Sequence, residues 1–75
     1  MELEKIRKII SDILKINEND IESDMSVTDD LGADSLEVCR IMAAVEELFD
    51  VEITPDDMKN IRTVRDAADY VIKSV

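Results

Sequence analysis

The chain has 75 residues, 19 of them acidic and 9 basic, which gives a formal net charge of -10 at neutral pH. This charge argues against nucleic acid or an anionic membrane as a partner, since both need a protein of opposite sign, and it favours partners with basic surfaces. The length allows one small domain, residues 1–75, without a large ligand cavity. With one Phe, one Tyr and no Trp, the composition suits helix packing and predicts an all-α fold.

Two residue types exclude further functions. The chain has no His, and Cys39 is its one cysteine. Nucleophilic catalysis by a Ser-His or Cys-His pair is therefore excluded, and a metal site would depend on carboxylates alone. We expect a protein that is not an enzyme, with no catalytic residues and no metal ligands. A lone cysteine forms no intrachain disulfide, and the first ten residues lack the apolar segment of a signal peptide or membrane span, so a cytoplasmic setting is expected.

Apolar residues at steps of three and four predict a first amphipathic helix over residues 3–14, with Ile6 and Ile10 in its inward stripe. Residues 15–34 are mostly acidic and polar. This long segment is predicted to be a loop that is pinned across the domain by its isolated apolar side chains, which are Ile21, Met25, Val27 and Leu31.

A second helix is predicted over residues 35–49. Asp34 and Glu37 have the spacing of a capping box, which places Ser35 in the first turn. The helical period predicts an inward face made of Val38, Ile41, Met42, Val45, Leu48 and Phe49, and an outward face with Leu36, Arg40, Ala43 and Glu47.

Two more helix starts follow. Thr54 as N-cap and Pro55 at the first helical position predict a short helix, and Thr63 with Asp66 predicts the cap of a last helix that continues to about residue 73. The predicted fold is a small four-helix bundle with three main helices, one short third helix and a long loop after the first. The expected core consists of Ile6, Ile10, Val45, Leu48, Phe49, Val64, Ala68 and Val71.

The segment Gly32-Ala33-Asp34-Ser35-Leu36 resembles the phosphopantetheine attachment motif of acyl carrier proteins. Residues 31–53 resemble the second helix of that family and the loop after it, and the chain is similar to the family in length, acidity and helix order. The resemblance implies that a phosphopantetheinyl transferase moves 4′-phosphopantetheine from coenzyme A to Ser35. Acyl groups would then be carried as thioesters on this arm, in fatty-acid or related biosynthesis.

The resemblance also implies two surfaces on a chain that we expect to be monomeric and not inserted in a membrane. The first would bind acyl-transferring and chain-elongating enzymes through the acidic residues Asp34, Glu37, Glu46 and Glu47, together with Asp50 and Asp56. The outward face of the second helix adds Leu36, Arg40 and Ala43 to this expected partner surface. The second would line a space for the acyl chain with Met42, Val45, Ile53, Met58, Ile61 and Ala67. Arg40 and Ala43 depart from the family, which has an acidic residue at the first position and often Met at the second.

Two other interpretations remain open at this point. The nearer one is a specialised carrier of a polyketide, aminoacyl or D-alanyl unit, since its thioester chemistry is the same. The more distant one is an acidic, divalent-cation-binding helical module, because Asp20, Glu22 and Asp24 start like a calcium-binding loop. That pattern then fails, with Met25 where Gly is needed and Leu31 where a bidentate Glu is needed.

Overall fold

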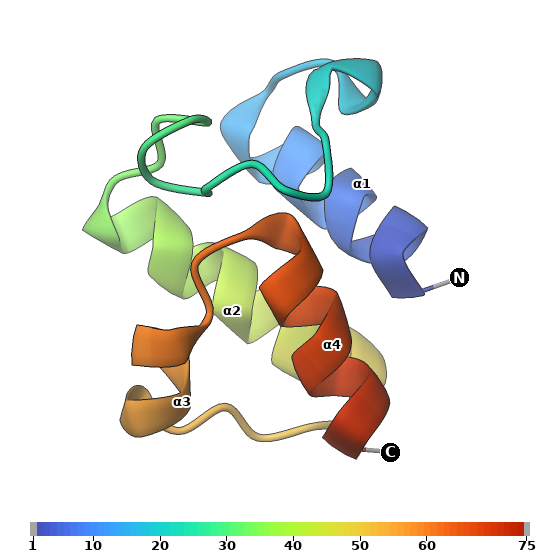
Figure 1. The fold of residues 1–75 in the computed structure, drawn as a ribbon, viewed down its shortest axis with the longest axis vertical. Helices are drawn as coiled ribbons and strands as arrows, with labels where there is room; N and C mark the ends of the chain where they lie inside the picture. Colours follow the sequence, from blue (N-terminus) through green and yellow to red (C-terminus); the bar gives the residue numbers. More distant parts are fainter. Residues whose placement is uncertain (1, 75) are drawn as a thin grey trace.

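The computed structural model describes residues 2–74, which fold into four α-helices and one short 3₁₀ helix (Figure 1). The helices are α1 (Glu2–Leu14), α2 (Ser35–Phe49), α3 (Pro55–Asn60) and α4 (Val64–Ser74), and the 3₁₀ helix is η1 (Glu18–Asp20). The all-α fold with a short third helix is confirmed. No strand forms within residues 2–74. A single antiparallel bridge between Ser26 and Thr63 is the one β-type pairing of these residues. The sequence pattern did not predict η1.

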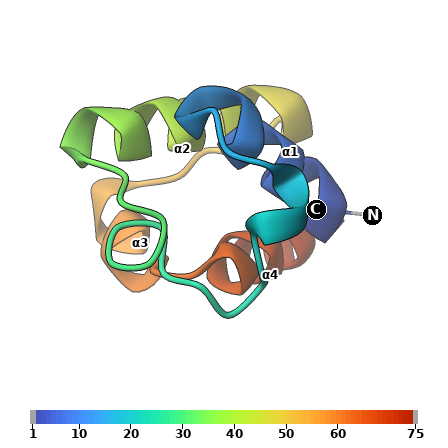
Figure 2. The same ribbon diagram turned by 90° about the horizontal axis from the view of Figure 1, so that it is seen from above.

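The three longer helices make up the body of the domain, and the main interhelix contacts join α1 to α4 and α1 to α2. Seen from above, α1 and α2 lie on one side, and α3 and α4 lie on the other (Figure 2). The long loop after α1 crosses one end of the bundle before it enters α2 (Figures 1 and 2). This arrangement brings the start of α2 to the same end as the loop.

Both predicted caps of the later helices form. The Thr54 hydroxyl accepts a hydrogen bond from the Asp57 N–H at 3.1 Å and begins α3, with Pro55 in the first turn. The Thr63 hydroxyl accepts from the Asp66 N–H at 3.0 Å, and the Asp66 carboxylate accepts from the Thr63 N–H at 3.1 Å. The backbone N–H groups of Thr63 and Arg62 lower the pKa of Asp66 by donating to its carboxylate. Such caps typically contribute about 1 kcal/mol each.

The core lies between α1, α2 and α4 and takes in side chains from the loop. Its largest fully buried side chains are those of Ile6, Ile10, Ile21, Ile41, Val45, Val64 and Val71. Ala68 is also buried, and Phe49 is half-buried against this cluster.

The placement of Leu48 in the core is wrong, because 54% of this residue is exposed. Ile41, Met42 and Val45 are the buried residues of α2. At 100° per residue, Leu48 lies at the edge of the arc that these three define, on the side of Arg40, and in the last turn of the helix. An apolar residue at the margin of a stripe is only partly covered by the neighbouring helices.

The loop is anchored as predicted. Ile21 and Val27 are buried, and Met25 and Leu31 are half-buried. Backbone bonds fix the same segment to the start of α4 and the chain just before it: the Val27 N–H donates to the Arg62 carbonyl at 3.0 Å, and the Val64 N–H donates to the Met25 carbonyl at 3.1 Å. This long loop is therefore part of the packed structure, because its backbone forms hydrogen bonds and its apolar side chains are covered by the core.

A polar contact fastens α3, which has no fully buried residue of its own. The Tyr70 hydroxyl in α4 lies 2.7 Å from the Glu52 carbonyl oxygen and 2.9 Å from an Asp57 carboxylate oxygen, and these two acceptors share its single O–H donor. The Thr54 hydroxyl, and next the Tyr70 hydroxyl, donate to this carboxylate and lower the pKa of Asp57 below its usual 3.8. The bond to Asp57 raises the pKa of Tyr70 above its usual 10.0.

We expect Tyr70→Phe to lower the melting temperature by a few degrees at neutral pH, because the substitution removes both bonds and keeps the ring. Asp57 has a lowered folded pKa, so its contribution is present above pH 3.8 and is lost as the pH falls through the folded value. Tyr70 has a raised folded pKa, so its contribution is present below pH 10.0 and is lost as the pH rises through the folded value. The melting temperatures of the original protein and of Tyr70→Phe should therefore differ most between pH 3.8 and pH 10.0. A difference that is independent of pH would contradict this account.

Candidate functional site

Ser35 is the first residue of α2, and a complete capping box holds this helix start. An Asp34 carboxylate oxygen accepts from the Glu37 N–H at 2.8 Å, and a Glu37 carboxylate oxygen accepts from the Asp34 N–H at 3.1 Å. Gly32, with φ of +75°, makes the turn into the helix in a backbone conformation that favours glycine. The capping box that the sequence spacing predicted thus fixes the backbone immediately before and after Ser35, and so fixes the position of Ser35 itself.

The Ser35 side chain is exposed, and no hydrogen bond engages its hydroxyl within residues 2–74. The N–H groups of Ser35 and Leu36 also lack an acceptor in this part of the chain, as expected for the first turn of a helix. Free N–H groups and the positive end of the helix dipole favour an anion at this position. The helix start can therefore accommodate a phosphate group on the Ser35 oxygen.

A hollow with mostly apolar walls opens beside Ser35. Its walls come from the loop, from α2 and from α3, and the residues are Thr28, Ala33, Asp34, Ser35, Val38, Cys39 and Met58. Sequence reasoning did not place Thr28, Val38 or Cys39 at the site. Cys39 was detectable, because it follows Ser35 by four residues and so shares its helix face. Thr28 had no local signal, since the path of the loop brings it there.

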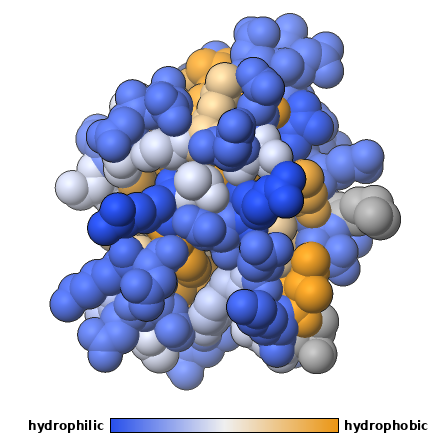
Figure 3. All heavy atoms as spheres, viewed as in Figure 1, coloured by the Kyte–Doolittle hydropathy of each residue, from blue (hydrophilic) through white to orange (hydrophobic). Residues whose placement is uncertain are grey.

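The predicted partner surface is largely presented to solvent. Asp34, Arg40, Ala43 and Glu47 are exposed, and Leu36 is 68% exposed, the highest value among the exposed large apolar residues. Figure 3 shows one face of the molecule as mainly hydrophilic with small separate apolar patches. Leu36 thus offers an exposed apolar side chain next to Ser35 in the sequence, with the charged residues Asp34, Glu37 and Arg40 nearby in the chain.

Two members of the predicted surface also have structural contacts. Glu37 is half-buried and closes the capping box. Glu46 is half-buried, and its carboxylate accepts from the Ile53 N–H at 2.7 Å, which ties α2 to the segment before α3. The cap formed by Glu37 was predicted from its spacing to Asp34, whereas Glu46 had been placed on the partner surface alone.

Arg40 lies in a second hollow, between the end of α1 and α2, whose lining also contains Asp12, Ile13, Lys15, Ala43, Ala44 and Glu47. Within residues 2–74 the one ion pair joins Lys59 to Asp56 at 4.0 Å. Arg40 is exposed and forms no ion pair within these residues, although Asp12 and Glu47 line the same hollow.

The six residues of the predicted acyl pocket belong to one packed region or lie against it. Met42, Val45, Ile53 and Ala67 are buried, whereas Met58 and Ile61 are half-buried. Of these, Met58 alone also lines the hollow beside Ser35. Met58, like Ala33 and Val38, therefore belongs both to the wall of this hollow and to the apolar residues in or against the core.

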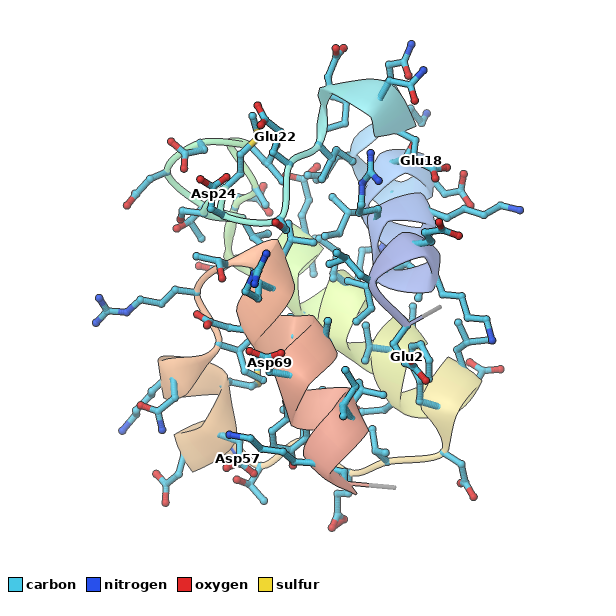
Figure 4. The ribbon with its side chains drawn as sticks, turned by 45° about the vertical axis from the view of Figure 1, so that its right-hand side comes forward. Glu2, Glu18, Glu22, Asp24, Asp57 and Asp69 are labelled. Atoms are coloured by element: carbon cyan, nitrogen blue, oxygen red, sulfur yellow. The ribbon has the colours of Figure 1, made fainter. Side chains whose placement is uncertain are left out.

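The cation-binding alternative has no geometric support. No group of three or more Cys, Asp or Glu side chains in residues 2–74 is arranged to hold a metal ion. The labelled acidic side chains in Figure 4 are distributed over α1, the loop, α3 and α4. In the same residues, no helix is long and apolar enough to cross a membrane.

Comparison with known proteins decides the family. The model of the phosphopantetheine attachment site matches residues 4–71. An acyl carrier protein of Syntrophobacter fumaroxidans is 47% identical over 70 residues, which cover 93% of this chain and 86% of that protein. The chain belongs to the acyl carrier protein family. Another relative, the acyl carrier protein of Nitratidesulfovibrio vulgaris, is 46% identical over 68 residues, covering 91% of this chain and 90% of that protein.

A solved structure supports the same assignment. The acyl carrier protein from Enterococcus faecalis, described for its high thermal stability, superposes with a TM-score of 0.84 at 34% identity and covers 99% of this chain and 94% of its own. The chain is thus a helical carrier of acyl groups whose cofactor is phosphopantetheine. The exposed hydroxyl and free N–H groups at the start of α2 fit the phosphate end of that cofactor.

Proposed function

We propose that the chain is a single cytoplasmic carrier domain on which Ser35 holds 4′-phosphopantetheine, and that it serves fatty-acid or related biosynthesis without catalytic activity of its own. The observation that supports this most directly is the exposed, unengaged hydroxyl of Ser35 at a capped helix start. The cofactor supplies a terminal thiol that forms thioesters with acyl groups. The chain supplies the attachment oxygen and the surface that partners bind.

Attachment is the work of a phosphopantetheinyl transferase. The Ser35 hydroxyl loses its proton and forms a phosphodiester bond to the phosphopantetheinyl group, while the bond between this group and the rest of coenzyme A breaks. The N–H groups of the first turn and the helix dipole then favour the phosphate charge. The open hollow between Ser35 and Met58 leaves an apolar surface beside the attachment oxygen. In this proposal, the acyl chain packs against Met58 and the residues behind it, namely Met42, Val45, Ile53, Ile61 and Ala67.

Loading tests the proposal. We expect the protein, incubated with a purified phosphopantetheinyl transferase and coenzyme A, to gain the mass of one phosphopantetheinyl group. Peptide mapping should locate this gain on the peptide that contains Ser35. A gain on another peptide, or no gain with an active transferase, would contradict the assignment.

Partner enzymes are proposed to contact the exposed side of α2 with basic docking surfaces. Asp34, Glu37, Glu46 and Glu47 would attract such surfaces, and Leu36 would supply an apolar contact beside Ser35. Charges at the rim of an interface act mainly on encounter rate and partner choice. This proposal therefore predicts that partner reactions slow as salt concentration rises.

A specialised carrier, loaded with a polyketide, aminoacyl or D-alanyl unit, remains the second candidate because of Arg40. This side chain is a positive charge on the exposed side of α2 that forms no ion pair within residues 2–74, next to the acidic residues of the predicted partner surface. It would repel enzymes built for an acidic residue at this position and attract an enzyme with a carboxylate opposite it.

Arg40→Glu is expected to shift selectivity from the native partner enzyme toward a general fatty-acid enzyme. Transfer rates with the two enzymes should be compared at several salt concentrations, and the shift should fade at high salt because screening weakens exposed charges. Lys8→Glu is a matched control, since it makes the same charge change on the exposed side of α1. Equal effects of the two substitutions would show that Arg40 acts only through net charge.

A further inference from the structure

A third hollow lies away from Ser35, where α1, the long loop and the start of α4 meet. Its walls include Arg7 from α1, Asn19 and Ser23 from the loop and Arg65 from α4. Two of the chain's guanidinium groups, 58 positions apart in the sequence, thus line one surface depression. Nothing in the proposed carrier function uses this depression.

Hydrogen bonds hold both guanidinium groups in place. Arg7 Nη2 donates to the Glu18 carbonyl oxygen at 2.9 Å, and Arg65 Nη2 donates to the Ser23 hydroxyl at 3.2 Å. Each guanidinium has five N–H donors, and each uses one in these bonds. The loop thereby orients two positive groups and leaves most of their donors available.

Neither arginine has a carboxylate partner, because Lys59–Asp56 is the one ion pair in the described residues 2–74. In addition, Arg7 Nε is buried without any hydrogen-bond partner. A buried N–H without an acceptor commonly indicates a missing water or ion. The buried Nε of Arg7, a residue that lines this hollow, indicates that an acceptor belongs beside it.

Glu22 and Asp24 also line the depression, and Figure 4 shows them on the loop above the start of α4. Their two negative charges offset the two arginines, so the lining has a formal charge of 2 - 2 = 0, against -10 for the whole chain. The depression is therefore much less repulsive to an anion than the average surface of this protein.

We propose that this hollow binds a phosphate-type oxyanion through Arg7 and Arg65, a function beyond the carrier role. Guanidinium groups match phosphate oxygens in geometry and charge. The two arginines come from different elements, α1 and α4, and Asn19 and Ser23 add polar side chains to the same lining. The phosphate group belongs to inorganic phosphate or to a nucleotide.

The test is an NMR titration of the full chain with sodium phosphate and, separately, with AMP, each against sodium chloride at equal ionic strength. Saturable shifts of the Asn19, Ser23 and Arg65 amide signals are expected with at least one phosphate compound and not with chloride. Tighter binding of AMP identifies a nucleotide as the source, and equal or weaker binding identifies free phosphate. Shifts that match those in chloride overturn the proposal.

Variants separate a binding site from a merely structural role of the arginines. Arg65→Gln should weaken phosphate binding about tenfold or more, since a hydrogen bond to a charged group is lost. Arg62→Gln is the matched control, because Arg62 is exposed and does not line the hollow. Glu22→Gln should strengthen binding by removing a repulsive charge. If Arg65→Gln lowers the melting temperature but leaves phosphate affinity unchanged, the arginines serve only to hold the loop and the proposal is wrong.

Discussion

Ser35→Ala is expected to abolish loading with phosphopantetheine while leaving the fold intact. The substitution removes the attachment oxygen, so no phosphodiester can form. Its structural cost should stay within about 0.5 kcal/mol, because the Ser35 side chain is exposed and Ala is a good helix former. Intact-mass measurement after incubation with transferase and coenzyme A checks the first expectation, and a thermal melt checks the second.

Thr28→Val is the matched control for this experiment. Thr28 carries the other hydroxyl side chain of the same hollow, and valine keeps its shape. This variant should load at a rate close to that of the unmodified sequence, since its hydroxyl is not the proposed acceptor. Loss of loading in Thr28→Val with retention in Ser35→Ala would move the attachment point from α2 to the loop and overturn the proposal.

Local sequence signals predicted the helices of this fold well, because the same residues that satisfy helix ends also appear at fixed spacings. The Thr63–Asp66 pair and the Thr54-Pro55 start both form caps where the pattern placed them. The stripe in α1 likewise places Ile6 and Ile10 in the core. In each case, the determining interaction lies within one or two helical turns.

Features that depend on contacts between distant segments could not be predicted in this way. The bond from Tyr70 to Asp57 joins residues 13 positions apart, and the bond from Arg65 to Ser23 spans 42 positions. The hollow beside Ser35 depends on Thr28 and Met58, which the loop and α3 bring to it. The periodicity of the sequence does not predict such long-range contacts, since they follow from how the loop crosses the bundle.

The candidate site likewise contains features that local sequence signals predicted and features that they did not. The position of Ser35 at a capped helix start was predictable from four consecutive residues, whereas the structural bond between Glu46 and the Ile53 N–H was not. A helical wheel also gives the direction in which a side chain points, but it does not show how far the neighbouring helices extend to cover that side chain. Leu48 shows this limit, because its direction is close to that of Ile41 and its exposure is very different.

This contrast within α2 leads to the second large expected effect. Ile41→Ala should lower the free energy of unfolding by about 2–5 kcal/mol, since Ile41 is fully buried and the substitution leaves a cavity. Leu48→Ala should cost about 1 kcal/mol or less, because more than half of Leu48 is already in water. Urea denaturation at constant salt measures the free energy of unfolding of both variants. If the slope of this free energy against urea concentration is unchanged, the variants are as compact as the original protein.

The total stability of so small a domain is modest, and Ile41→Ala could leave part of the protein unfolded without urea. Ile41→Val then provides the measurement, with an expected cost of about 0.5–1.5 kcal/mol for one lost methyl group. The ratio of the Ile41 and Leu48 effects is the decisive quantity, because both residues are in one helix and both are changed to alanine. Equal costs for the two alanine variants would mean that Leu48 is covered in solution, and the core would then extend to the last turn of α2 as its apolar stripe had predicted.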